Sequence, residues 1–107
     1  MTIVYVTYAG DAATRFDREY YVAHHLPLVM EAWGRHGLES CSAFFPADPD
    51  AKTIAIAECR FRDDAAVDAA FGSPETPRVM ADLANFTDVA PERSRAVPCR
   101  CDGASRA

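Results

Sequence analysis

The sequence lacks the long apolar run and the motifs that define several large classes of protein. No run of about 18 apolar residues is present, which argues against a helical membrane span. The N-terminus, MTIVYVTYAGDA, has no basic segment ahead of a long apolar core, so we expect no signal peptide and a cytoplasmic location. A P-loop, a G-x-G-x-x-G after the first strand, a G-x-S-x-G and a zinc motif are all missing, so no cofactor is expected.

Positive charge and cysteine are also scarce. The 11 Lys and Arg residues are outnumbered by 16 Asp and Glu, so neither nucleic acid nor an anionic membrane surface is expected as a partner. Cys41 and Cys59 lie in strand-like runs, where a free thiol behaves as a small buried hydrophobe. Cys99 and Cys101 are too close together for a zinc knuckle and have no second pair. We therefore expect no disulfide framework.

The length of 107 residues suits one domain. We expect this domain over residues 1–100, followed by a polar tail at 101–107. Alternating β-branched and aromatic residues, turn residues and helix signals together predict the order β-α-β-β-α-β. This order is typical of a ferredoxin-like α+β fold, with a four-stranded antiparallel sheet and both helices on one face. Strands are expected over residues 2–8, 38–45, 53–61 and 92–99, and helices over 17–35 and 65–71, with a further helical stretch at 77–83.

The first strand is apolar or aromatic on both of its faces. Val4, Val6 and Tyr8 alternate with a second set that contains Ile3 and Tyr5. Such a strand is typically covered on both sides. Helices can cover one face of the sheet, and in so short a chain the other face requires a second subunit. We therefore expect a homodimer with two sheets packed face to face.

The richest stretch is FDREYYVAHHLPLVMEAWGRHG, residues 16–37. At about 100° per residue, His25 lies in the middle of an apolar arc, whereas His24 falls on the polar side. Pro27 removes one backbone donor and should bend the helix beside these histidines. Tandem histidines point in different directions and His36 is distant, so no metal site is expected.

His25 has two interpretations. It can be a packed core histidine whose nitrogens are satisfied by the backbone or a tyrosine. Alternatively, burial lowers its pKa and leaves a neutral ring that can act as a general base on an acidic C–H or phenol. Tyr21 lies one turn earlier on the same arc, where it could orient the ring or donate to a developing oxyanion. We take His25 and Tyr21 as the candidate catalytic residues.

Two segments resemble a known family. RFDREYYVAHHLPLV is similar to the F-D-x-x-Y-Y-x-x-x-H-x-P-L pattern of ethyl tert-butyl ether degradation (EthD) proteins, and AAFGSPETPRVMADLANFTDVAPE is similar to their A-A-F … I-M-A-D-I-x-N-Y-T-D-x-x-P segment. The resemblance implies a dimeric α+β barrel and maps the family histidine to His25. Relatives of this fold include cofactor-independent monooxygenases, lactone isomerases, dehydratases and decarboxylases. Only the last strand is less apolar than the family pattern.

The expected ligand is a small hydrophobic molecule, aromatic or polyketide-like, bound between the helix and the sheet. The chemistry expected is cofactor-independent dehydration, isomerisation or oxygenation; no residue supports a nucleotide- or flavin-dependent oxidoreductase. A non-catalytic accessory protein that binds such a ligand and a plain structural domain are the alternatives. The candidate substrate-binding residues are Tyr8, Trp33, Phe44, Asn85 and Phe86.

Overall fold

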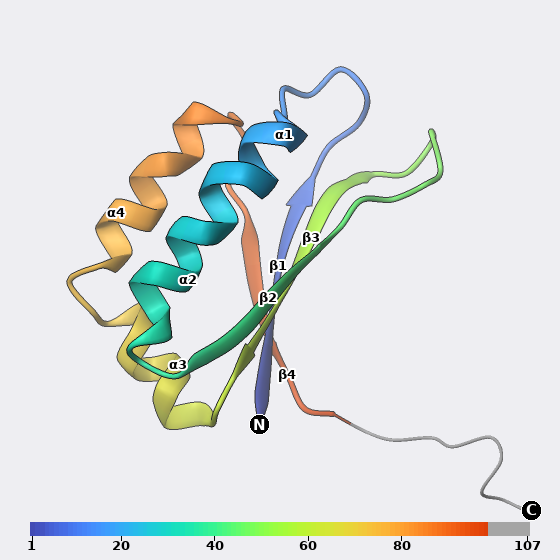
Figure 1. The fold of residues 1–107 in the computed structure, drawn as a ribbon. Coiled ribbons are helices and arrows are strands. Elements are labelled where there is room, and N and C mark those ends of the chain that lie inside the picture. Colours follow the sequence, from blue (N-terminus) through green and yellow to red (C-terminus); the bar gives the residue numbers. More distant parts are fainter. Residues whose placement is uncertain (99–107) are drawn as a thin grey trace, which may run out of the picture.

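The computed structural model describes residues 1–98, so the expected domain end at residue 100 and the polar tail at 101–107 lie outside the described residues. Strands and helices follow one another in the predicted order (Figure 1). The elements are β1 (Thr2–Ala9), α1 (Arg18–Tyr20), the π-helical turn η1 (Tyr21–His25), α2 (Leu26–Gly34), β2 (Leu38–Phe44), β3 (Thr53–Phe61), α3 (Asp64–Phe71), α4 (Thr76–Ala81), the 3₁₀ turn η2 (Asp82–Asn85) and β4 (Glu92–Ala96).

The four strands form one antiparallel sheet in the order β2-β3-β1-β4. The helices lie together on one face of this sheet, and the opposite face carries none (Figure 1). The predicted ferredoxin-like α+β fold is therefore confirmed. No helix of residues 1–98 is long and apolar enough to cross a membrane.

The hydrophobic core lies between the sheet and the helices. Alternate side chains of β1 and β3 point toward the helices, because successive residues of a strand face opposite sides. Val4 and Tyr8 of β1 and Phe61 of β3 are almost fully buried there, as is Val67 of α3. This packing fixes the distance between α2 and the central strands, where the candidate site lies.

Side-chain caps begin two of the helices. The Asp17 carboxylate accepts a hydrogen bond from the backbone N–H of Tyr20 at 3.0 Å. The Asp63 carboxylate accepts one from the N–H of Ala66 at 2.8 Å, so Asp63 rather than Asp64 caps α3. Each cap satisfies a donor that the helix cannot pair internally.

Pro27 changes the first long helix more than a simple bend would. The N–H of Leu26 bonds to the carbonyl of Tyr21, five residues back, and η1 therefore has π-helical geometry. Pro27 has no N–H with which to continue an α-helical pattern, and it opens α2. The wider turn also shifts the buried face. Tyr21 and His25 are buried, but Val22, between them in the sequence, is 49% exposed.

The last strand is shorter than its sequence predicts. β4 covers Glu92–Ala96 rather than residues 92–99, and Pro98 follows it. β4 lies at the edge of the sheet, where a nearby proline is tolerated.

Candidate functional site

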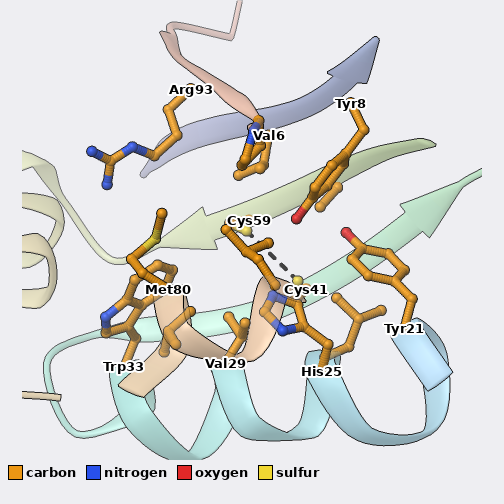
Figure 2. Close-up of a pocket in the computed structure, with 15 residues that line it drawn as sticks. Val6, Tyr8, Tyr21, His25, Val29, Trp33, Cys41, Cys59, Met80 and Arg93 are labelled. Atoms are coloured by element: carbon orange, nitrogen blue, oxygen red, sulfur yellow. Dashed lines mark hydrogen bonds between the residues drawn. The ribbon is translucent and has the colours of Figure 1, made fainter. Parts of the chain in front are cut away.

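An apolar cavity of about 120 Å³ lies between α2 and the sheet (Figure 2). Its wall is formed by residues of all four strands on one side and of η1, α2, α4 and η2 on the other. A cavity of about 150 Å³ is known to hold benzene, so this volume suits roughly one aromatic ring. The aliphatic part of the wall consists of Val6, Leu26, Val29, Ala57, Val79 and Leu83.

His25 is an ionisable group set in this apolar wall. It belongs to η1 and is only 4% exposed, whereas its neighbour His24 is exposed to solvent. Burial lowers the pKa of His25 below its ordinary value of 6.5, and Asp82 opposes that shift only in part. The imidazole is therefore neutral at neutral pH.

Asp82 orients the His25 ring. Its Oδ2 atom lies 2.9 Å from Nδ1 of His25. An ionised carboxylate can only accept, so the hydrogen sits on Nδ1 and Nε2 keeps a free lone pair. His25 thus presents an unprotonated nitrogen at the cavity wall.

Two further residues hold Asp82 in its ionised form. The Tyr20 hydroxyl donates to Oδ1 at 2.6 Å, and the Asn85 side-chain amide donates to the same oxygen at 3.0 Å. Burial alone would raise the pKa of Asp82, but these bonds and the one from His25 lower it below the usual 3.8. The result is a fixed carboxylate behind the histidine.

Two tyrosines form the other polar part of the cavity. The hydroxyls of Tyr8 and Tyr21 point toward each other within it (Figure 2). Burial raises the pKa of both phenols, so both stay protonated and can donate. The Tyr21 ring also stacks on His25, with 5.6 Å between centroids and 18° between planes. The tandem tyrosines therefore divide their contacts: Tyr20 binds Asp82, and Tyr21 faces the cavity.

The structure brings some of the predicted ligand-contacting residues together and leaves others apart. Tyr8 and Trp33 line the cavity, and Trp33 is fixed by a 3.0 Å hydrogen bond from Nε1 to the Thr76 hydroxyl. Phe86 is fully buried against His25, at 4.7 Å between ring centroids, and it supports the ring from outside the cavity wall.

Phe44 and Asn85 lie outside the cavity, contrary to the sequence expectation. In β2, Cys41 lines the cavity, so Phe44, three residues on, faces the opposite side of the sheet and is 52% exposed. Asn85 is exposed, and its amide is engaged by Asp82 and Tyr20. Its contribution is to position Asp82 rather than to contact a ligand.

Sequence reasoning missed Asp82 and Tyr20. A signal for both was present, because each falls within a quoted family segment, Tyr20 in the paired tyrosines and Asp82 three residues before Asn85. Their link to His25 is a tertiary contact, which exists only in the folded chain. The His25–Asp82 contact joins residues 57 positions apart, which no helical period can reveal.

Two cysteines meet at the sheet side of the cavity. Cys41 of β2 and Cys59 of β3 are register partners, with Sγ atoms 3.6 Å apart (Figure 2). The hydrogen bond with Cys59 lowers the pKa of Cys41, and it raises that of Cys59 together with burial. Within residues 1–98 no three His, Cys, Asp or Glu side chains converge as metal ligands.

The fold and this cavity define a class: a small α+β protein whose sheet and helices enclose an apolar site with one buried histidine. The EthD domain model matches residues 11–90, and the chain therefore belongs to the EthD family. The chain is also 38% identical over 88 residues to the uncharacterized 11.0 kDa protein in the thcB-thcC intergenic region of Rhodococcus erythropolis, covering 80% of this chain and 81% of that protein.

Solved structures share the fold. An EthD-like protein from Ralstonia eutropha superposes with a TM-score of 0.76 at 23% identity, over 89% of this chain and 88% of that one. SnoaB, a cofactor-independent oxygenase from Streptomyces nogalater, superposes with a TM-score of 0.63 at 14% identity, over 94% of this chain and 93% of its own. At these identities, the two structures show the fold alone.

Proposed function

We propose that this protein binds a small hydrophobic molecule in the cavity and catalyses a cofactor-independent proton transfer on it. The observation that carries the proposal is the His25–Asp82 pair, with Nδ1 and Oδ2 2.9 Å apart at the wall of an apolar cavity. A buried, neutral, oriented imidazole is the group that general-base catalysis requires near neutral pH. The fold shared with SnoaB, itself a cofactor-independent oxygenase, supports this class of chemistry.

The residues suggest a simple sequence of steps. Nε2 of His25 takes a proton from an acidic C–H or a phenol of the ligand, which leaves the negative charge on the ligand oxygen. Asp82 stabilises the imidazolium, and the Tyr8 and Tyr21 hydroxyls donate to the oxyanion. Return of the proton to another ligand atom completes an isomerisation, and its return to a departing hydroxyl completes a dehydration. His25 is then neutral again.

The experiment uses 2-indanone, a neutral aromatic ketone with acidic C–H bonds, dissolved in D₂O. We expect the protein to accelerate exchange of its α-hydrogens above the buffer rate, followed by proton NMR. His25→Gln should lower the protein-dependent rate by about 10²- to 10⁴-fold, the range for general-base catalysis. His24→Gln, which alters the exposed neighbour, is the matched control. Undiminished exchange in a folded His25→Gln protein would remove His25 from the chemistry.

A non-catalytic accessory role is the second candidate, favoured by the same cavity. In that case Nε2 of His25 only accepts a hydrogen bond from the ligand. Binding of 2-indanone without protein-dependent exchange would select this alternative.

We also propose that two chains pair through the sheet face that carries no helices (Figure 1). Register pairing brings Thr7, Ile56 and Phe44 into one row across that face, and Tyr5 and Glu58 into the next. The Tyr5 hydroxyl donates to Glu58 at 3.2 Å, which satisfies one polar group within the row. The half-exposed Phe44 gives this face an apolar end that a second copy would cover. We expect a solution mass of two chains.

A further inference from the structure

We propose that Arg93 makes the cavity selective for an anionic ligand, an aromatic or similarly apolar molecule that carries a carboxylate or another fixed negative charge. This inference rests on the proposed ligand cavity and adds the chemical class of its ligand.

Arg93 is placed at the cavity by the strand register. It belongs to the edge strand β4, where its Cα partner is Val6 of β1. Paired residues on antiparallel strands point to the same face, so both side chains project toward the helices. Both residues line the cavity, and Figure 2 shows the guanidinium beside Met80.

Packing holds the guanidinium in that position. Its central carbon lies 4.3 Å from the ring centroid of Phe71, in α3. A guanidinium stacked on an aromatic ring keeps its edge donors free for a planar anion. The side chain is exposed rather than buried, so Arg93 stands at the mouth of the cavity and not in its interior.

The charge of Arg93 is not neutralised within the described part of the chain. Arg95, on the same strand and the same face, pairs with Asp68 at 3.0 Å and with Asp64 at 3.6 Å. Arg93 forms no ion pair with a carboxylate of residues 1–98. In a chain of net charge −5, a cation left unpaired at the entrance of an apolar cavity is suited to hold an anion.

The cavity then has three zones in sequence. His25 and the two tyrosines lie at one end, aliphatic side chains line the middle, and Arg93 stands at the other end (Figure 2). A ligand with an apolar ring and a charged group at one edge would place the ring near His25. Charge-assisted hydrogen bonds to Arg93 would fix its direction in the cavity.

The test compares two ligands of nearly the same shape, the anionic 3-phenylpropanoate and the neutral 3-phenylpropanamide. Their dissociation constants are measured by the NMR shifts of the cavity-wall amides. We expect the carboxylate to bind about three- to tenfold more tightly than the amide. Arg93→Gln should abolish this preference and Arg93→Lys should keep part of it. Arg95→Gln, the matched control, should keep all of it.

Equal binding of the two ligands to the wild-type protein would overturn the inference, as would a preference that survives in Arg93→Gln. Loss of the preference in Arg95→Gln as well would overturn it too, because the preference would then come from the overall positive charge of β4 and not from Arg93. Absence of any shift at the cavity wall would overturn both this inference and the ligand cavity. The exchange of neutral 2-indanone needs no anionic group, so it reports on the proposed function separately.

Discussion

The Nδ1 atom of His25 lies 2.9 Å from Oδ2 of Asp82, and the two residues come from separate helical turns on the same side of the sheet. The contact has opposite effects on the two partners. It raises the pKa of His25 against the larger effect of burial, and it helps to lower the pKa of Asp82.

Replacing Asp82 should therefore change the titration of His25. In Asp82→Asn the burial remains but the negative charge is gone, so we expect the pKa of His25 to fall below its wild-type value. A pH titration of the labelled His25 ring by NMR measures the change. Asp88→Asn is the control, because Asp88 pairs with Arg15 at 3.0 Å and has no contact with His25. An unchanged or raised pKa would show that Asp82 does not stabilise the charged ring.

His25 also makes the free energy of unfolding depend on pH. The folded-state pKa of His25 is lowered below 6.5, so above that value neither the folded nor the unfolded chain carries the extra proton. As pH falls below about 6.5, His25 binds a proton in the unfolded chain but not in the folded chain. The free energy of unfolding therefore decreases. The loss should approach about 1.4 kcal/mol per pH unit until the folded pKa is reached.

Denaturant unfolding measures this effect. Below pH 6.5, the free energy of unfolding of His25→Gln should change less with pH than that of the wild type. The comparison concerns the slope, since the substitution can also change stability at every pH. His24→Gln, at an exposed ring, should keep the wild-type slope. A His25→Gln slope equal to that of the wild type would contradict the burial of a neutral His25.

Alanine substitutions at two glycines near the end of α2 should change the free energy of unfolding in opposite directions. Gly37 has a φ of +112°, and a Cβ there would lie 2.5 Å from the Cβ of Ala66. Gly37→Ala should therefore lower the free energy of unfolding by at least about 2 kcal/mol. Gly34 is helical with open space around its Cβ position, so Gly34→Ala should raise it by about 0.5 kcal/mol. Thermal or denaturant unfolding of both variants measures the difference. Equal changes in the free energy of unfolding would contradict the packing of Gly37 against α3.

The proposed dimer face predicts a change of mass on substitution. Phe44 is 52% exposed in the single chain, so the fold itself can tolerate a charge there. We expect Phe44→Glu to convert a dimer into a monomer, measured by sedimentation or light scattering. Val22→Glu places the same charge at a similarly exposed apolar residue on the helical side, and it should stay dimeric. A wild-type mass of one chain would exclude the dimer.

Local patterns predicted most of the fold. Runs of β-branched and aromatic residues indicated strands such as Thr2–Ala9, and polar capping residues such as Asp17 indicated helix starts, because these signals act over a few residues. The π-helical turn was not predicted. A proline indicates a missing donor, but whether the helix bends or widens depends on the packing of Tyr21 and His25 against the sheet.

The candidate site was predicted less completely. The apolar arc and the H-x-P spacing selected His25 over His24, and burial agrees with that choice. Asp82, Tyr20 and Arg93 were not identified, since each reaches the site through a tertiary contact. Phe44 was placed in the site by its aromatic character alone, whereas the strand register directs it to the other face.

The pH dependence of protein-catalysed 2-indanone exchange tests the central claim most directly. A neutral, buried His25 that acts as the base predicts a rate that rises with pH through a pKa below 6.5 and is level above it, after subtraction of the buffer rate. Asp82→Asn should shift this rise to lower pH, and His25→Gln should remove it. A rise centred above 6.5, or one that persists in His25→Gln, would contradict the account.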